Sequence, residues 1–462
     1  MIQPSKPEAY DLIHQGALVF SEIEHNGMRI DVGYLDKTIV QVEARVKRLE
    51  DNLRSCDEYS LQRKRYGKQT NLTSRDQLAQ VLFGDMDYEC KSFTSGGAKG
   101  VKRPQLDEVA LERIGSKYAK GFLRLEKLNK LLGTYLRGVR REVEDDGFLH
   151  PFFNLHTVHS HRSSSSNPNF QNIPIRDPMI AKLIRQAFVP RDGHVLVETD
   201  YSAQEFRVCA CFWNDPAMIA YASDPNLDIH RDMAAECYML DEVPKNCRFF
   251  AKNQFVFPEL YVSYYVSCAK NLWGAIDLGD LKTANGVGLK DHLVEKGIQG
   301  LGEFQSGKSL KQGTFEKHIK EVEEEFNNRF PVWSQKKIDW LKRYRGRGWF
   351  EMLTGFVCSG VFSRNQLYNI PIQGPSFHCL LWSLIRLVKE MKKKRMKSVV
   401  VGQIHDSILC DVHKSELDDY IQMVRRIMTE DIVKAWPWIV VPLSIDVEVA
   451  ESCWFDKGPL RG

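Results

Sequence analysis

The chain has 462 residues, of which 43% are hydrophobic and 27% are charged. This composition excludes a disordered chain, and the length allows about two to four domains that each bury a core. The 64 Lys and Arg residues nearly balance the 60 Asp and Glu residues, so the formal net charge is only +4. A uniformly basic surface is therefore excluded, and affinity for nucleic acid would have to come from locally placed charge.

The eleven cysteines are an odd number and form no CxxC pair. Neither a disulfide framework nor a structural zinc site is indicated, which favours a reducing, intracellular compartment. The N-terminus lacks an apolar core of signal-peptide length, and no run of about 18 apolar residues occurs. The sequence therefore predicts a cytoplasmic protein without a membrane span.

The first third of the chain is predicted to be mainly helical. Apolar residues recur at helical spacing over residues 8–52, with one turn at residues 25–31. A capping box at Thr73–Asp76 predicts the start of a further helix. A long basic helix is expected from Arg124 to Glu144.

The next segments alternate between loops and short strands. Residues 162–178 are rich in Ser, Asn and Pro, which predicts a loop. Strands are expected over residues 193–202, over residues 398–412 as a pair joined at His405 and Asp406, and over residues 440–449. Because long helical segments separate these four strands, we expect an α+β fold with an antiparallel sheet and helices packed on it.

The middle of the chain is predicted to be helical again. Residues 245–273 have a helical, aromatic-rich pattern, and residues 316–330 form an amphipathic helix. Between them, residues 274–313 are rich in Gly and charge. This composition predicts a mobile insertion of two short helices and loops.

Two aspartates stand where apolar strands end or turn. A carboxylate is costly at such a place unless a cation or a donor meets it, and Asp200 and Asp406 together suit a metal site. Carboxylates on neighbouring strands can hold two Mg²⁺ ions roughly 3.5–4 Å apart, as phosphoryl transfer requires. Taken alone, an Asp at a strand end is more often an ordinary turn residue.

The surrounding motifs carry a resemblance. TDYSAQEFRVCA (residues 199–210) resembles the first palm motif of family A DNA polymerases, and QIHDSI (residues 403–408) resembles their second acidic motif. Further similar motifs follow the family order: RSSSSNPNFQNIPIR, DIHRDMAAECY, NIPIQG and WFDKG. Several ordered motifs are far more specific than one. The chain is thus identified as a member of the DNA polymerase I-like family, polymerase region only, with FVFPELYVSYY most like its bacteriophage branch.

The resemblance implies a right-hand polymerase fold. The thumb would span residues 1–145, and the palm residues 146–240 and 355–462. The fingers would span residues 241–354 and include the Gly-rich insertion.

The resemblance also implies the metal site and the sugar contact. Asp200 and Asp406 would bind two Mg²⁺ ions, with the Tyr201 carbonyl as a further ligand. Glu205 would pack under the sugar and leave no room for a 2′-hydroxyl. Without the motif, Glu205 would read as an acid paired with Arg207.

The nucleotide would meet a helix of the fingers. The resemblance assigns substrate binding to Arg248, Lys252, Phe257, Tyr261 and His230. Lys252 and Phe257 are five residues apart, whereas the family pattern RxxxKxxxFxxxYG has four. One extra residue rotates the two halves of an α-helix by about 100°, so either the helix bulges or one half is misassigned.

Two further residues depart from the family pattern, and two phenylalanines have an alternative role. Val262 stands where the family has Gly, and Ser407 replaces the Glu that usually follows the second acid. Phe255 and Phe257 could equally be core residues.

Contacts to primer–template DNA are expected from polar residues in loops and turns. The loop supplies Arg162, Asn169, Gln171 and Asn172, and the corresponding candidates near the primer terminus are Gln373 and His405.

The sequence thus predicts template-directed addition of dNTPs to a primer 3′-hydroxyl. No exonuclease motif precedes the thumb-like segment, so we expect no proofreading by this chain. A separate 3′–5′ exonuclease polypeptide or a truncated form of a longer chain would each explain this. The viral resemblance places the protein in the host-cell cytoplasm. A two-metal nuclease and a polymerase-like protein that only binds DNA remain alternatives.

Overall fold

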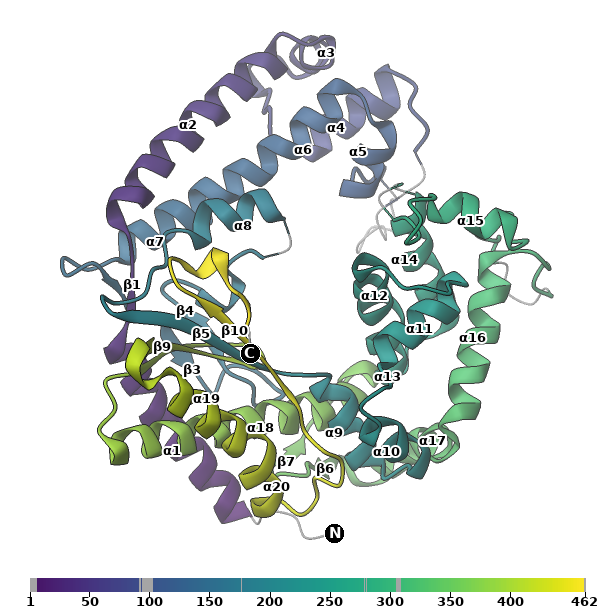
Figure 1. The fold of residues 1–462 in the computed structure, drawn as a ribbon. Helices are drawn as coiled ribbons and strands as arrows, with labels where there is room; N and C mark the ends of the chain where they lie inside the picture. Colours follow the sequence, from purple (N-terminus) through teal and green to yellow (C-terminus); the bar gives the residue numbers. More distant parts are fainter. Residues whose placement is uncertain are drawn as a thin grey trace.

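The computed structural model describes residues 6–90, 93, 103–175, 177–277, 279, 281–304 and 309–460. In Figure 1 the main sheet lies left of the centre, with helices from residues 32–130 above it, helices from residues 229–329 at the right, and helices from residues 6–26 and 364–435 beneath it. The α+β expectation is confirmed. Among the described residues, no helix has both the length and the apolar composition that a membrane crossing needs.

The central sheet has five antiparallel strands in the order β11-β10-β5-β9-β8. The strands are β5 (His194–Tyr201), β8 (Val399–Ile404), β9 (Ser407–His413), β10 (Ile445–Ala450) and β11 (Gly458–Pro459). The structure adds the short β11 to the four expected strands and starts β10 five residues later than expected. β5 is the middle strand, so a neighbour on each side fixes its register.

Helices cover one face of this sheet. The helices that contact the sheet are α1 (Lys6–Asn26), α18 (Arg364–Lys394) and α19 (Leu417–Arg426), and α9 (Gln204–Trp213) and α20 (Ile432–Ala435) pack against α18. The Tyr201 hydroxyl lies 3.0 Å from Ser383 Oγ and donates to the Met428 carbonyl oxygen at 3.0 Å. The end of β5 is therefore anchored to the helical layer beneath it.

The N-terminal helices follow the expected order with shifted ends. They are α2 (Val32–Arg54), α3 (Asp57–Tyr66), α4 (Arg75–Gln80), α5 (Glu108–Ile114), α6 (Lys117–Lys130), α7 (Arg137–Glu142) and α8 (Pro178–Arg185). The predicted capping box was wrong by one residue, because Ser74 caps α4 by accepting from Gln77 N at 3.3 Å. The basic helix begins before Arg124 and contains a π-helical turn at Leu131–Leu136.

The turn at residues 25–31 includes β1 (Met28–Arg29), which pairs with β2 (Phe148–Leu149). The predicted loop at residues 162–178 contains short regular elements. Within it β4 (Ser164–Ser166) pairs with β3 (Phe152–Asn154), and Phe170–Asn172 form a 3₁₀ turn.

The middle helices form the body opposite the N-terminal helices. They are α10 (Pro216–Ser223), α11 (Ile229–Tyr238), α12 (Lys245–Ala251), α13 (Phe257–Leu260), α14 (Tyr265–Asp277), α15 (Leu289–Glu295), α16 (Phe315–Arg329) and α17 (Pro331–Arg347), followed by the hairpin β6 (Trp349–Glu351) and β7 (Val357–Ser359). The expected helix over residues 245–273 is divided, because a π-helical turn occupies Lys252–Val256 and the chain bends after Tyr261.

The insertion at residues 274–313 differs from the expectation of two short helices. Within its described residues the structure has one, α15. Residues 278, 280 and 305–308 of this predicted segment lie outside the description.

None of the eleven cysteines, all of which lie in the part of the chain that the structure describes, forms a disulfide. Nine of the eleven are buried, and Cys56 and Cys90 are only partly buried. Burial raises the pKa of the Cys247 and Cys358 thiols to about 11, so both stay protonated at neutral pH. These thiols contribute as small apolar side chains.

Candidate active site

The two predicted metal-binding acids come together at one end of the sheet. Asp200 is the penultimate residue of β5, and Asp406 lies in the two-residue turn between β8 and β9. Tyr201 N donates to the Asp406 carbonyl oxygen at 3.4 Å, so the two backbones are adjacent. His405, the other turn residue, has a left-handed backbone with φ 50°. The hairpin therefore places Asp406 beside Asp200 although they are far apart in sequence.

Negative charge accumulates around Asp200. Its residue is exposed at the strand end, yet protein atoms replace much of the water around its carboxylate. Loss of water and then the charges of Asp406 and Glu198 raise the pKa of Asp200 to about 7. Asp446, its partner on β10, acts in the same direction. Oxygen ligands with excess negative charge suit a hard divalent cation, so the donor set fits Mg²⁺.

Arg162 lies between the carboxylates of Asp406 and Glu205. Its Nη2 donates to Asp406 Oδ1 at 2.8 Å, and its Nη1 lies 3.7 Å from Glu205 Oε1. The sequence predicted this arginine as a DNA contact. In the structure, its guanidinium offsets part of the negative charge of the cluster.

Glu205 is held by the opposite body. It lies on α9, is 8% exposed, and accepts a hydrogen bond from the Tyr261 hydroxyl. Burial and then Asp406 raise the pKa of Glu205. The alternative partner Arg207 is engaged elsewhere, since its Nη1 donates to the Ala222 carbonyl oxygen at 2.8 Å. Glu205 thus links the sheet side of the site to the helix that carries Tyr261.

The irregular spacing of that helix has a structural explanation. The extra residue between Lys252 and Phe257 is absorbed by the π-helical turn, in which Phe257 N donates to the Lys252 carbonyl oxygen. Lys252 Nζ consequently lies 5.3 Å from the centre of the Phe257 ring. The Phe257 and Tyr261 rings are stacked 6.4 Å apart. The turn is the bulge that the spacing required, and it keeps these three residues on one face.

The two phenylalanines of this run have different surroundings. Phe255 is fully buried and packs against Phe326, with 5.9 Å between the ring centres. Phe257 is only partly buried. The core interpretation therefore holds for Phe255, whereas Phe257 faces the site.

Cations and a neutral histidine lie beside Phe257. His230 is 1% exposed, its ring lies 5.7 Å from that of Phe257, and neither ring nitrogen has a hydrogen-bond partner among the described residues. Burial, followed by Lys252 and Arg248, lowers the pKa of His230 to about 3. Arg248 Nε donates to Asp228 Oδ2 at 2.7 Å. At neutral pH this face is cationic through its Lys and Arg only.

The predicted DNA-contacting residues divide into buried and exposed sets. Gln171 is 8% exposed, and its Nε2 donates to Gln403 Oε1 at 2.7 Å, which ties the loop to β8. Asn169 and Asn172 are exposed and line a cavity of about 490 Å³ that Lys130 and Tyr135 also border.

The two candidates near the primer terminus are separated from that cavity. Gln373 is partly buried on α18 near the Tyr261 hydroxyl, and His405 is exposed beside Asp406.

Sequence reasoning missed two acids next to Asp200. Glu198 accepts from Lys457 Nζ and Trp454 Nε1, both at 2.8 Å, and from Ser407 Oγ at 3.1 Å. Burial favours a higher pKa for Glu198, but Lys457, Trp454 and Arg185 together outweigh burial and lower the pKa. Asp446 lies directly opposite Asp200 on β10. The signal was the two-residue alternation along β5, which puts Glu198 on the face of Asp200.

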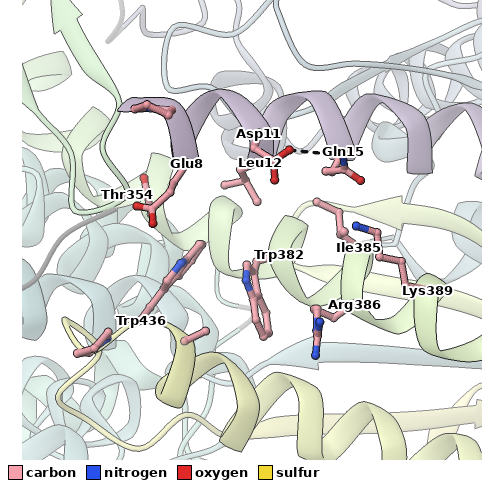
Figure 2. Close-up of a pocket in the computed structure, with 13 residues that line it drawn as sticks. Glu8, Asp11, Leu12, Gln15, Thr354, Trp382, Ile385, Arg386, Lys389 and Trp436 are labelled. Atoms are coloured by element: carbon pink, nitrogen blue, oxygen red, sulfur yellow. Dashed lines mark hydrogen bonds between the residues drawn. The ribbon is translucent and has the colours of Figure 1, made fainter. Parts of the chain in front are cut away.

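Two other features lie apart from these acids. Glu144, Asp146 and His150 have ligand atoms within 4.8 Å of one another near β2. A cavity of about 600 Å³ lies between α1 and α18, with Glu8 and Asp11 on one wall and Trp382 and Arg386 across from them (Figure 2). Neither feature includes Asp200 or Asp406.

The fold and this arrangement define a polymerase-type domain. Over 95% of this chain and 69% of the other, the structure matches the "POL domain of Pol1 from M. smegmatis complex with DNA primer-template and dNTP", with TM-score 0.72 and 23% identity. The model of DNA polymerase family A matches residues 35–276 and 359–456. The chain belongs to DNA polymerase family A.

Curated relatives agree with this membership. The DNA polymerase of Bacillus phage SP01 is 25% identical over 89% of this chain and 46% of its own length. DNA polymerase I of Bacillus subtilis is 25% identical over 95% of this chain and 45% of its own length. The thermostable DNA polymerase I of Thermus thermophilus is 26% identical over 94% and 47%. The chain spans about half the length of these relatives.

Proposed function

We propose that this chain catalyses template-directed addition of deoxynucleotides to a primer 3′-hydroxyl. The observation that carries the proposal is the meeting of Asp200 and Asp406 at one end of the sheet, opposite a cationic, aromatic helix face. The M. smegmatis structure of the same fold is described as a complex with primer–template and dNTP. The same two kinds of ligand would meet here between the sheet and the middle helices.

The N-terminal helices, the middle helices and the part that contains the sheet would correspond to the thumb, fingers and palm of a right-hand polymerase. The N-terminal helices up to residue 145 serve as the thumb, and residues 241–354 serve as the fingers. Residues 146–240 and 355–462 contain every strand of the central sheet and serve as the palm.

Asp200 and Asp406, with the Tyr201 carbonyl, would hold two Mg²⁺ ions. When bound, such ions lower the pKa of an attacking hydroxyl and stabilise charge on the transferred phosphate. The support is the negative charge that raises the pKa of Asp200, which a cation would relieve. Arg162 already donates a hydrogen bond to Asp406, so the protein supplies one positive group itself.

The helix of the fingers binds the incoming nucleotide. Arg248 and Lys252 would neutralise the triphosphate, and Phe257 offers an aromatic face next to the Lys252 ammonium. His230 is kept uncharged, so it would serve as a neutral hydrogen-bond partner for a phosphate oxygen.

Sugar selection falls to Glu205 and Tyr261. The hydrogen bond from the Tyr261 hydroxyl holds the Glu205 side chain in place. A fixed side chain under the sugar excludes a 2′-hydroxyl sterically, and it thereby favours dNTPs over ribonucleotides.

The DNA side of the site lies along the loop after β3. Arg162, Asn169 and Asn172 would contact the duplex near the primer end, and Gln171 would hold the loop against β8. Gln373 and His405 would act near the primer terminus. Exposed amides and cations of this kind suit phosphate and minor-groove contacts.

Editing is assigned to none of the residues that match family A, which take up most of the chain. The exonuclease would lie either on a separate polypeptide or on a longer form of this one. A separate 3′–5′ exonuclease would correct errors, in the cytoplasm of the host cell if the chain is viral.

Primer extension tests the proposal. A labelled primer on a longer template is incubated with Mg²⁺ and all four dNTPs, beside a lane without dNTPs. Growth with dNTPs and an intact primer without them are expected. Shortening without dNTPs would instead indicate the nuclease, and no change in either lane would indicate a DNA-binding protein.

A further inference from the structure

The turn that follows Asp200 is short and strained. Ser202 and Ala203 connect Tyr201, the last residue of β5, to α9, and Ala203 has a left-handed backbone with φ 50°. A residue with a Cβ rarely adopts this conformation, because the Cβ crowds the following carbonyl oxygen, so neighbouring contacts have to hold the residue there. The turn carries the Tyr201 carbonyl on one side and leads directly to Glu205 on the other. Its position therefore decides where both groups point.

Strand β10 and the residue just before it hold this turn from one side. Ser202 N donates to the Ser444 carbonyl oxygen at 2.9 Å. The Ser202 hydroxyl donates to Asp446 Oδ2 at 2.7 Å. Asp446 pairs directly with Asp200, so both side chains are on one face of the sheet. The acid that grips the turn thus stands next to the acid that would bind metal.

Arg207 holds the same turn from the helix side. Its Nε donates to the Ser202 carbonyl oxygen at 3.1 Å, and its Nη2 donates to Ser444 Oγ at 3.1 Å. Its Nη1 donates to the carbonyl oxygens of Ala222 and Pro442. Each of its three nitrogens is thus engaged with a main-chain or hydroxyl oxygen. This planar fork joins the turn, α10 and the segment before β10 into one unit.

We propose that Ser202 and Asp446, braced by Arg207, are positioning residues that fix the metal-binding end of β5. Ligand atoms must be held to about 0.5 Å, and groups behind them commonly set metal affinity by 10–100-fold. Ser202 and Asp446 touch neither substrate nor metal in this role. They act by holding the turn that presents the Tyr201 carbonyl and sets the direction of Glu205. The inference rests on the proposed function for its metal site.

A double-mutant cycle tests whether Ser202 and Asp446 act together to hold the turn, an arrangement that we call the clamp. The variants are Ser202→Ala, Asp446→Ala, the double variant and Asp446→Asn, with Glu451→Gln as a matched control at an exposed acid shortly after β10. Mn²⁺ binding is measured by calorimetry on each protein with a dideoxy-terminated primer–template, so the readout needs no turnover. Thermal unfolding of each variant checks that it is folded.

Ser202→Ala is expected to weaken Mn²⁺ binding about 10-fold, because the turn loses its hydroxyl contact. Asp446→Ala should weaken it more, since charge is lost as well, and Asp446→Asn should lose less because it keeps an oxygen acceptor for Ser202. In the double variant, removal of Ser202 should add nothing to Asp446→Ala. Losses that multiply, or Mn²⁺ binding by Ser202→Ala equal to that of the wild-type protein, would overturn the clamp.

The same proteins separate this inference from the proposed function. Wild-type protein that binds Mn²⁺ with the expected coupling but extends no primer would support the clamp and refute the polymerase. Wild-type protein that extends primers while the cycle shows no coupling would do the reverse. Absence of Mn²⁺ binding by the wild-type protein would refute both.

Discussion

The two sides of the proposed active site are built from different elements, and they tolerate irregularity differently. Asp200 lies on a strand with a paired neighbour on each side. Lys252 and Phe257 lie on a helical run that contains one extra residue as a π-helical turn. A one-residue slip in a strand sends every later side chain to the other face, whereas a helix can absorb the residue locally. The sheet side, which is the proposed palm, is therefore rigidly specified, and the helical side, which is the proposed fingers, can vary.

Each side also contains a carboxylate with a raised pKa, for different reasons. Asp200 has a pKa of about 7 among other acids at the open end of β5. Glu259 has a pKa of about 8 because it is buried on α13, next to Glu323. The first arrangement leaves charge for a ligand to neutralise, and the second contributes to the stability of the fold. Four predictions test this contrast.

The largest effect is expected at the palm. Asp406→Ala should lower the rate of nucleotide incorporation by roughly 10³-fold or more, since it removes half of the metal-binding pair. Single-turnover primer extension measures the rate, and fluorescence anisotropy measures the dissociation constant for primer–template, which should change less than about threefold. Glu451→Gln is the control. Extension by the Asp406 variant at a near-normal rate would refute the assignment.

The buried acid of the fingers should affect pH dependence and not chemistry. Because the pKa of Glu259 is raised in the folded state, its contribution to stability is fully present below the ordinary value near 4.5 and is lost as pH rises to about 8. Between pH 5 and 8.5, Glu259→Gln should lose less free energy of unfolding than the wild-type protein, by on the order of 3 kcal/mol. Urea unfolding at both pH values measures this difference.

The groups that face Glu259 supply the control. Cys268 Sγ donates to it at 3.4 Å, and Glu323 and Lys337 add opposite charges from α16 and α17. Cys268→Ala removes a donor that lowers the pKa of Glu259, so the variant's loss of free energy of unfolding between pH 5 and 8.5 should be at least as large as that of the wild-type protein. Equal slopes for wild-type and Glu259→Gln proteins would mean that another group titrates.

A smaller effect is expected where the two sides meet. Glu205→Ala should relax discrimination against ribonucleotides by roughly 10- to 100-fold, because it removes the side chain that would exclude a 2′-hydroxyl. Each factor of ten corresponds to about 1.4 kcal/mol. Tyr261→Phe, which keeps the ring and removes the hydroxyl that donates to Glu205, should relax it less. The ratio of kcat/KM for dNTP and rNTP is the measurement. Unchanged ratios in both variants would place the selecting group elsewhere.

The smallest effect is expected from shortening the fingers helix. Deleting Gln254 from the π-helical turn should give a regular α-helix with Lys252 and Phe257 four apart, and the KM for dNTP should change less than about 10-fold. Deleting Val197 from β5 is the matched change in the palm. It should abolish folding or extension, because the register of Asp200 would shift. Equal tolerance at both sites would break the comparison.

The sequence was sufficient for features that depend on local order. Asp200 and Asp406 could be paired because their motifs have a fixed order, and the α+β fold followed from strands separated by helices. The five-residue spacing between Lys252 and Phe257 revealed an irregularity in the helix. It did not reveal the π-helical turn, because an α-helix with a displaced half fits the same letters.

Features that depend on register and side-chain direction were out of reach. Asp446 faces Asp200 only because β10 pairs with β5 in one particular register. Arg162 was expected to contact DNA, and its bond to Asp406 depends on how the loop folds over the sheet. The capping residue Ser74 was displaced by one from the expected position, since either of two adjacent hydroxyls could cap α4.

The burial of the cysteines has a practical consequence. Only the thiolate form reacts with maleimides or oxidants, and an enclosed thiol with a raised pKa is both protonated and inaccessible. Nine of the eleven thiols are enclosed in this way, whereas Cys56 and Cys90 are partly open, both within the N-terminal third of the chain. The native chain thus offers two natural attachment points for fluorophores or spin labels, which would report motion of the N-terminal helices over the sheet without any engineered residue.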